Sequence, residues 1–357
     1  MNFHNLAKKY LELYTNTKNQ LNAAHSRKMT RKYTVQKGIL TPLQEKQVKD
    51  FYGPYTKTTT LFHAFFLEKT GQFYPEHIPN DLYYTKIDPY FNPENLGRAL
   101  DNKCLYNRLF PGIAQAQTVV CSMAGLWYDA NMQWISWENA AALMDKQDAV
   151  FVKLATTSSG GKGVYYLEAK DGSLSQQLQG RVKPQADVVV QVPLRQHTAM
   201  AALHESSVNT LRLLSLLTND GVKIYSSVVR MGAGNSKVDN ASSGGITCGI
   251  TDDGFLKKYA FKASGEKFEK HPTSGIVFDG YEIPGFEKAK QMVKKAHPMV
   301  PYFKMISWDI AINENAEAVM IEANFIRGEL DFHQLNNGPL FGEDTKKILD
   351  EVFGKNK

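Results

Sequence analysis

The sequence predicts an α+β protein in which a mostly helical N-terminal lobe precedes two lobes of mixed helix and strand. Three observations carry this prediction. Apolar residues recur at helical spacing in residues 1–75, helix and strand signals alternate from about residue 100 to 153, and the second half contains paired strands. The chain of 357 residues, 43% apolar and 22% charged, is long enough for two or three packed lobes.

The N-terminal lobe is expected over residues 1–98. Thr41-Pro42-Leu43-Gln44 has the capping-box pattern with proline at the first helical position, so it marks a helix start. Another helix is predicted over residues 61–69 and should end at Gly71. Residues 74–93 are rich in proline, asparagine and aspartate, which favours turns. The earliest helix is predicted from apolar side chains at helical spacing, which are Leu6, Tyr10, Leu13 and Tyr14.

Two further lobes are expected at residues 99–190 and 191–357. The first should contain helices at 101–109 and 137–144 and strands at 118–120 and 149–153. An apolar run at 188–192, predicted as a strand, lies at the boundary between them, and the second should contain a helix at 286–297 and hairpins at 211–229 and 305–323. Asp220-Gly221 is a strong hairpin signal.

Composition and charge exclude several classes of protein. The net charge of +6 is spread along the chain, so no nucleic acid is expected as a partner. The N-terminus has no continuous apolar run, so we expect neither a signal peptide nor a membrane span, and a cytoplasmic location. Cys104, Cys121 and Cys248 lie far apart without a CxxC pair and are predicted to be buried small hydrophobes. The nine histidines lack HxxxH and HxH spacing, so no transition metal is expected.

A glycine-rich loop follows a predicted strand at residues 152–164, which read VKLATTSSGGKGV. Small residues let backbone amides approach phosphate oxygens, and the flanking Lys153 and Lys162 add positive charge. The segment matches neither a Walker A loop nor a GxGxxG fingerprint. Taken alone, it fits a flexible hairpin turn with solvated lysines equally well.

Three oxygen-bearing side chains are predicted to converge near the C-terminus. Glu322 and Asn324 are two apart in a strand and so share a face. If the hairpin turns through a two-residue loop at Asn315-Ala316, Asp309 lies across from Glu322 with Cβ atoms about 5 Å apart. Burying two carboxylates without a cation is costly, and oxygen ligands suit Mg²⁺. A solvated hairpin face is the alternative.

Two arginines sit in apolar strand sequence. Arg212 and Arg230 both follow apolar residues, and a buried guanidinium group normally faces an anion. Recognition of phosphate or carboxylate fits this need, and a structural salt bridge to a glutamate of another strand is the alternative. Residues 239–245, DNASSGG, form a second small-residue loop with donors for an oxyanion.

The order of these motifs resembles the ATP-grasp superfamily. Asp309 followed by Glu322-Ala323-Asn324 looks like that family's metal motif. Residues 208–212, residues 238–245 and Trp308-Asp309 are similar to the sugar-transfer-associated ATP-grasp branch. The resemblance covers the chain from about residue 101 to its end. It implies two α+β lobes that hold ATP between them, preceded by a helical extension.

The resemblance implies a role for each motif. The residues expected to bind ATP are Lys103, Lys153, Ser159, Gly160, Gly161, Lys162, Gly163, Gln191, Val192 and Leu194, of which 159–163 would form a lid and 191–194 a hinge. Many relatives have a glutamate where this hinge has Gln191. The residues expected to hold Mg²⁺ are Asp309, Glu322 and Asn324. Arg212 and Arg230 would stabilise the transferring phosphoryl group. The residues expected to bind substrate are Asn240, Ser243, Gly244, Gly245 and Arg327, although Arg327 could equally pair with Glu329 or Asp331.

These roles imply an ATP- and Mg²⁺-dependent carboxylate–amine ligase that works through an acyl-phosphate and forms ADP. No covalent nucleophile is needed, and no catalytic triad stands out. A kinase acting on a sugar or alcohol would use the same residues, and a nucleotide-binding assembly module without turnover is a further alternative. The expected substrates are a small carboxylate and an amine, an amino acid or a sugar acid of polysaccharide synthesis. A homodimer and an association with glycan-synthesis enzymes are left open.

Overall fold

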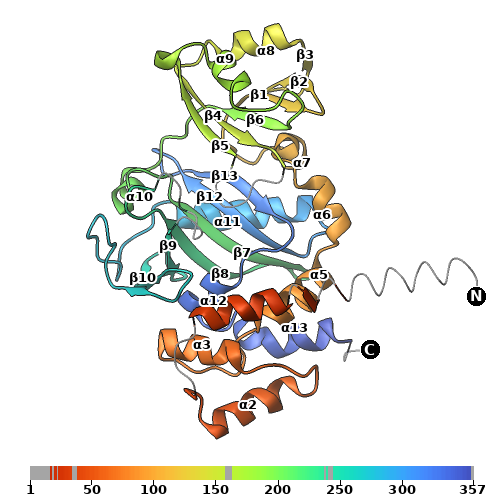
Figure 1. Ribbon diagram of the computed structural model, residues 1–357, viewed down its shortest axis with the longest axis vertical. Helices are drawn as coiled ribbons and strands as arrows, with labels where there is room; N and C mark the ends of the chain where they lie inside the picture. The colour runs from red at the N-terminus through yellow and green to blue at the C-terminus, as the bar shows by residue number, and fades with distance from the viewer. Residues whose placement is uncertain are drawn as a thin grey trace, which may run out of the picture.

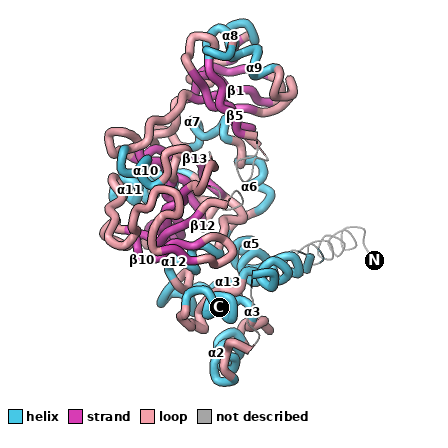
Figure 2. Tube along the Cα trace, turned by 60° about the vertical axis from the view of Figure 1, so that its left-hand side comes forward, coloured by secondary structure: helices cyan, strands magenta, loops and turns pink. Residues whose placement is uncertain are grey.

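The computed structural model describes residues 38–156, 163–236 and 244–354, together with Asp239 and residues 17, 20–21 and 23–33. Figure 1 shows three parts along the longest axis: a small lobe, a large lobe built on a wide sheet, and a group of helices beyond that sheet. The same order is visible in Figure 2. The helix predicted from Leu6 to Tyr14 lies outside the described residues.

The small lobe is an antiparallel sheet of six strands in the order β3-β2-β1-β6-β4-β5. The strands are β1 (Thr118–Met123), β2 (Leu126–Asp129), β3 (Trp134–Ile135), β4 (Ala149–Leu154), β5 (Val164–Glu168) and β6 (Val188–Gln191). Helices α8 (Trp137–Met144) and α9 (Leu174–Gln179) cover one face. Val150 and Val152 of β4 pack on that face. Lys153 is the next residue of the strand after Val152, so its side chain points to the opposite face.

The large lobe is an antiparallel sheet of seven strands in the order β11-β10-β9-β8-β7-β12-β13. The strands are β7 (Thr210–Thr218), β8 (Gly221–Met231), β9 (Ile246–Ile250), β10 (Leu256–Phe261), β11 (Lys267–Phe268), β12 (Met305–Ile312) and β13 (Ala318–Asn324). The predicted turn at Asp220-Gly221 is confirmed, since Thr218 pairs with Gly221 around a two-residue loop. Short segments around the lobe include α10 (Thr198–Leu203) and η5 (His297–Met299).

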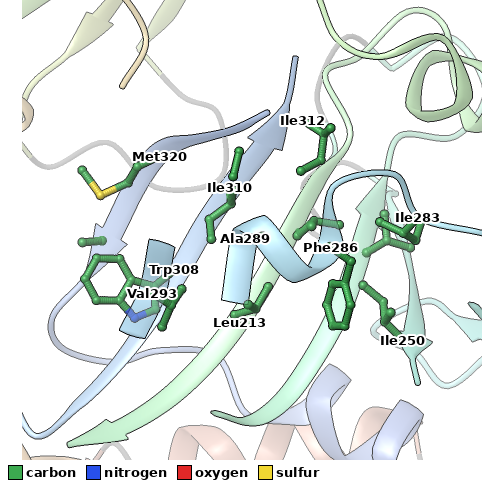
Figure 3. Packing of buried hydrophobic residues seen from close by; sticks show 14 of the residues in the cluster. Leu213, Ile250, Ile283, Phe286, Ala289, Val293, Trp308, Ile310, Ile312 and Met320 are labelled. Atoms are coloured by element: carbon green, nitrogen blue, oxygen red, sulfur yellow. The ribbon is translucent and has the colours of Figure 1, made fainter. Parts of the chain in front are cut away.

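Helix α11 (Phe286–Ala296) covers one face of the large sheet and forms the main core with it. Figure 3 shows Phe286, Ala289 and Val293 of this helix against side chains of the strands. The helix begins after Gly285, which has a positive φ of 67°. A Cβ at Gly285 would lie 2.7 Å from the Ala316 carbonyl oxygen, so this close approach requires glycine.

The N-terminal helices cover the other face of the large sheet. Val48 and Tyr52 of α2 (Pro42–Tyr52) share a core with Leu214 and Leu216 of β7. The capping box that predicts the start of α2 is confirmed. Helix α13 (Thr345–Val352) packs in the same core, while α3 (Leu61–Thr70), α12 (Asp331–Asn337) and η6 (Gly342–Asp344) lie around it. The helical region is therefore part of the large lobe's packing.

The turns predicted for residues 74–93 are wrong over much of that range. Residues 80–91 are helical, as α4 (Asn80–Leu82), the π-helical η1 (Tyr83–Ile87) and α5 (Asp88–Phe91). Tyr83, Ile87 and Phe91 recur every four residues, and their side chains are buried against one face of the large sheet. This packing outweighs the turn preference of the prolines and asparagines between them. Helix α6 (Glu94–Leu100), η2 (Lys103–Leu105) and α7 (Tyr106–Leu109) then lead to the small lobe.

The three cysteines are buried and free of disulfides, as predicted. No helix in the described part of the chain is long and apolar enough to cross a membrane.

Candidate active site

Asp309 and Glu322 face each other because of a β-bulge in β13. The β12–β13 hairpin closes around residues 314–316, with the Asn313 N–H donating to the Glu317 carbonyl oxygen at 2.9 Å. This three-residue loop would by itself place Asp309 opposite Ile321. The pairing skips Ile321, so Asp309 lies opposite Glu322. The predicted two-residue loop is wrong, but the predicted pair of carboxylates is confirmed.

The same bulge decides which face of the sheet carries the polar side chains. Met320 before the bulge and Ala323 after it both pack in the core beneath α11. Glu322 and Asn324 therefore lie on the opposite face, which Asp309 shares. In a regular strand they would point into the apolar core with Met320. Bulges commonly redirect side chains next to functional sites in this way.

Asp309 lies beneath two guanidinium groups. Its Oδ1 accepts from Arg212 Nε at 2.5 Å and from Arg230 NH1 at 3.1 Å. Its Oδ2 accepts from Arg212 NH2 at 3.0 Å, and all three side chains are buried. Burial raises the pKa of Asp309, but the two arginines outweigh it and hold that pKa below its usual value. The anion that both arginines face in this structure is thus Asp309 of β12, the strand next to that of Arg212 and one strand further from that of Arg230.

Glu322 links the large lobe to the small one through Lys103. The Lys103 Nζ lies 2.9 Å from Glu322 Oε1, with side chains that are 10% and 24% exposed. The Lys103 N–H donates to the Ala155 carbonyl oxygen at 3.1 Å, which ties this lysine to the end of β4. Both residues are predicted to lie at the site, but their pairing is not predicted from the sequence.

Lys153 is a partly buried cation with a neutral partner. Its Nζ donates to the Gln191 Oε1 at 2.9 Å, and Gln191 Nε2 donates to the Ala116 carbonyl oxygen at 3.3 Å. Among the described residues, no carboxylate forms an ion pair with Lys153 within 4.0 Å. Burial lowers the pKa of Lys153 to about 8, while the Glu322 charge raises it and the Lys103 charge lowers it. An anion placed beside this ammonium group would restore the charge balance.

The lid and hinge residues are placed only in part. Ser159, Gly160, Gly161 and Lys162 lie outside the described residues. Gly163 lies at the start of β5, and its carbonyl oxygen accepts from the Leu154 N–H at 2.9 Å. This bond pairs the end of β4 with the residue before β5, next to Lys153 in the chain. In the hinge, the Val192 N–H already donates to the Gln117 carbonyl oxygen at 2.9 Å, and Leu194 follows in an irregular segment.

The structure describes only some of the predicted substrate residues. Asn240 and Ser243 lie outside the described residues, whereas Gly244 and Gly245 lead directly into β9. Arg327 pairs with neither Glu329 nor Asp331. Its NH2 lies 3.1 Å from Glu94 Oε1, so the expected surface ion pair has a different partner. This contact joins the segment after β13 to the first turn of α6.

Asp239 is a further site residue, whose own role is not predicted from the sequence. Its Oδ2 accepts from the Thr210 hydroxyl, and its Oδ1 lies 3.7 Å from Arg230 NH2. Burial raises the pKa of Asp239, against the lowering effect of Arg230. The charges thus alternate along Asp239, Arg230, Asp309 and Arg212. The signal for Asp239 in the sequence is its place as the first residue of the small-residue loop at 239–245.

Comparison with protein families finds one family that this chain matches. Residues 83–349 match the family described as sugar-transfer associated ATP-grasp, which is most of the chain. The chain belongs to the sugar-transfer-associated ATP-grasp family. The two antiparallel sheets with helices before them are the ATP-grasp fold predicted from the sequence. A comparison with curated proteins finds no match.

Several solved structures resemble this chain weakly. They include N5-carboxyaminoimidazole synthase from Aspergillus clavatus, with 10% identity, a TM-score of 0.42 and coverage of 72% of this chain and 54% of that one. D-cycloserine synthetase has 11% identity and a TM-score of 0.43, over 75% and 74% of the two chains. D-alanine-D-alanine ligase from Coxiella burnetii has 10% identity and a TM-score of 0.41, over 72% and 60%. This chain spans little more than half the length of the first. With TM-scores of 0.41 to 0.43, none of these likenesses bears on the fold or the function of this chain.

The donor set of this ATP-grasp chain fits a hard divalent cation in part. Glu322 and Asn324 offer oxygen atoms on one half-exposed face, as Mg²⁺ requires. Asn324 Nδ2 donates to the Ser307 carbonyl oxygen at 3.1 Å, which leaves the amide oxygen as an acceptor. Asp309 differs, because both its oxygens already accept from arginines, so a cation would have to share it. Lys103 neutralises the Glu322 carboxylate, and the arginines neutralise that of Asp309. The described residues contain no cluster of three or more His, Cys, Asp or Glu side chains that could hold a metal ion.

Proposed function

We propose that this protein is an ATP- and Mg²⁺-dependent carboxylate–amine ligase that forms an acyl-phosphate and releases ADP. The observation that carries the proposal is the partly buried Lys153, which lies near the Lys103–Glu322 pair with only an amide as its hydrogen-bond partner among described residues. Removing much of a cation from water without an anion beside it is unfavourable. The phosphates of ATP supply that anion, and the family to which the chain belongs supports this choice.

The proposed reaction needs positive charge around two anions. A carboxylate that attacks the γ-phosphoryl group brings negative charge toward negative charge. Lys103 and Lys153 would bind the phosphates from the small lobe, and Arg212 and Arg230 would face the carboxylate and the transferring group from the large lobe. Glu322, Asn324 and Asp309 would hold Mg²⁺, which supplies further charge neutralisation when bound.

Asp309 has a second role in this arrangement. Because it accepts from both arginines, it fixes the direction of their planar guanidinium groups before any substrate binds. Groups that are already oriented need no rearrangement at the moment of reaction. The residues 159–163 would close over the nucleotide and keep water from the acyl-phosphate until the amine attacks it. No side chain has to form a covalent bond to the substrate.

We further propose an amino acid as one substrate and a sugar acid as the other, in the synthesis of a cell-surface polysaccharide. The test is a screen for ADP release over pairs of amino acids and sugar acids, with Glu322→Ala as the blank. Ligation predicts ADP release that needs both substrates, and a product whose mass is that of the two joined with loss of water. A phosphorylated acceptor that forms without an amine would establish a kinase instead. ATP binding without amine-dependent ADP release from any pair would favour the assembly module.

The affinity for ATP should fall as the pH rises through about 8. Lys153 binds phosphate only in its charged form, and its pKa of about 8 leaves it largely neutral at pH 9 and above. ATP itself is already fully ionised there, since a terminal phosphate has a pKa of about 6. We expect the Kd to rise toward tenfold per pH unit above the pKa in calorimetric titrations. Lys153→Arg, which stays charged, should bind ATP equally at about pH 7.5 and 9. A wild-type Kd that does not change over this range would contradict the assignment.

A further inference from the structure

A second pocket lies in the small lobe, away from the proposed ATP site. It has a volume of about 520 Å³, which falls within the roughly 300–1,000 Å³ of small-molecule sites. Three of the four tryptophans of the chain line it, namely Trp127, Trp134 and Trp137. We call it the tryptophan pocket.

The tryptophan pocket and Lys153 are on opposite faces of the small sheet. The pocket is lined by Leu178 of α9 and Val188 of β6, which belong to the core under α8 and α9. Val189, the neighbour of Val188, packs on the other face with Cys104, next to Lys103. A ligand in the tryptophan pocket would therefore be separated from the nucleotide by the sheet. The pocket is not an extension of the site described above.

The pocket presents aromatic rings to solvent. Trp134 is 70% exposed and Leu126 is 49% exposed, although both are large apolar side chains. The rings of Trp127 and Trp137 lie 5.0 Å apart and form the wall beside them. Clustered apolar groups that remain exposed at a hollow mark a binding surface. Trp134 sits on β3, the two-residue edge strand, where the sheet adds no further cover.

Polar groups stand at the edge of these rings. Gln179 and Lys183 line the pocket and are exposed. In the described part of the chain, Lys183 makes no ion pair within 4.0 Å. A wholly apolar ligand would leave the amide and the ammonium group unused. A ligand that contacts all of these groups has an apolar face against the indoles. It has hydroxyl groups for the Gln179 amide and a negative charge for the Lys183 ammonium group at its edge.

We propose that the tryptophan pocket binds an acidic saccharide. A pyranose ring has an apolar face of C–H groups, which stacks on an indole, and hydroxyl groups around its edge. A uronic acid adds the carboxylate that Lys183 would meet. The volume of about 520 Å³ lies within the range of small-molecule sites, so a short saccharide segment is the expected occupant. This inference goes beyond the proposed ligase activity and does not depend on it.

Tryptophan fluorescence tests the proposal on the full chain without ATP. The fourth tryptophan, Trp308, is fully buried in the large lobe, so a change in emission on adding ligand reports on the pocket. Digalacturonic acid should produce a saturable change, and the neutral disaccharide lactose should bind at least about tenfold more weakly because it lacks the carboxylate. Lys183→Gln should remove most of that preference.

Trp134→Ala should weaken digalacturonic acid binding at least about tenfold, measured by calorimetry as well as by fluorescence. Tyr302→Ala is the matched control, because Tyr302 is also 70% exposed but lies in the large lobe, and it should bind as the wild type does. The proposal fails if digalacturonic acid gives no saturable signal, or if Trp134→Ala binds it unchanged. It also fails if Trp134→Ala converts a dimer to a monomer in light scattering, since the exposed rings would then be a contact between copies.

Discussion

Glu322→Gln should lower ADP release at saturating ATP by at least about 100-fold, the usual cost of removing one preorganised group from an active site. The substitution keeps the size of the side chain but removes the charge that pairs with Lys103 at 2.9 Å. It also removes the charge that raises the pKa of Lys153. The fall in ATP affinity with rising pH should therefore begin at a lower pH than in the wild type. Steady-state ADP release and calorimetric titrations over a range of pH measure the two effects.

Glu317→Gln is the matched control for this experiment. Glu317 lies on the same hairpin and also pairs with a lysine, Lys288, but both side chains are more than half exposed. An exposed pair of this kind contributes little, so turnover should stay within about twofold of the wild type. If Glu322→Gln retained more than half of the wild-type rate, Glu322 would not belong to the reaction.

Asp309→Ala should lower the free energy of unfolding by about 3–5 kcal/mol, because it leaves two buried guanidinium groups without their shared carboxylate. Arg212 and Arg230 are each about 5% exposed, so water cannot replace the lost partner. Asp309→Asn retains one acceptor oxygen and should cost less. Urea denaturation followed by circular dichroism measures the difference.

Asp344→Asn provides the comparison. Asp344 pairs with the exposed Lys223 at the surface, so its replacement should cost at most about 1 kcal/mol. A loss of stability in Asp309→Ala no larger than that in Asp344→Asn would show that the buried ion network contributes little. The wild type should also lose stability in acid more steeply than Asp309→Asn. Its aspartate has a lowered pKa in the folded state, so protonation at low pH removes a contribution that is present near neutrality.

Much of the fold follows from local patterns. The capping box at Thr41, the Asp-Gly hairpin at residue 220 and the helix after Gly285 all appear where the sequence predicts them. Each depends on hydrogen bonds or backbone angles within a few residues, so neighbouring residue types suffice to specify it. Residues 80–91 show the opposite case. Their turn-forming residues are overruled by burial of Tyr83, Ile87 and Phe91 against strands more than 120 residues away in the chain.

The sequence by itself determined the chemistry of the site: lysines, arginines, carboxylates and an asparagine, in an order similar to the ATP-grasp family. It also placed Glu322 and Asn324 on one face, since two residues in a strand always share one. Only the tertiary structure decided how these charges pair. The bulge at Ile321 turns the Glu322 side chain away from the core. Asp309 forms ion pairs with both arginines, and Lys103 forms one with Glu322. These pairings depend on register and on contacts between distant segments, which residue spacing within one strand does not encode.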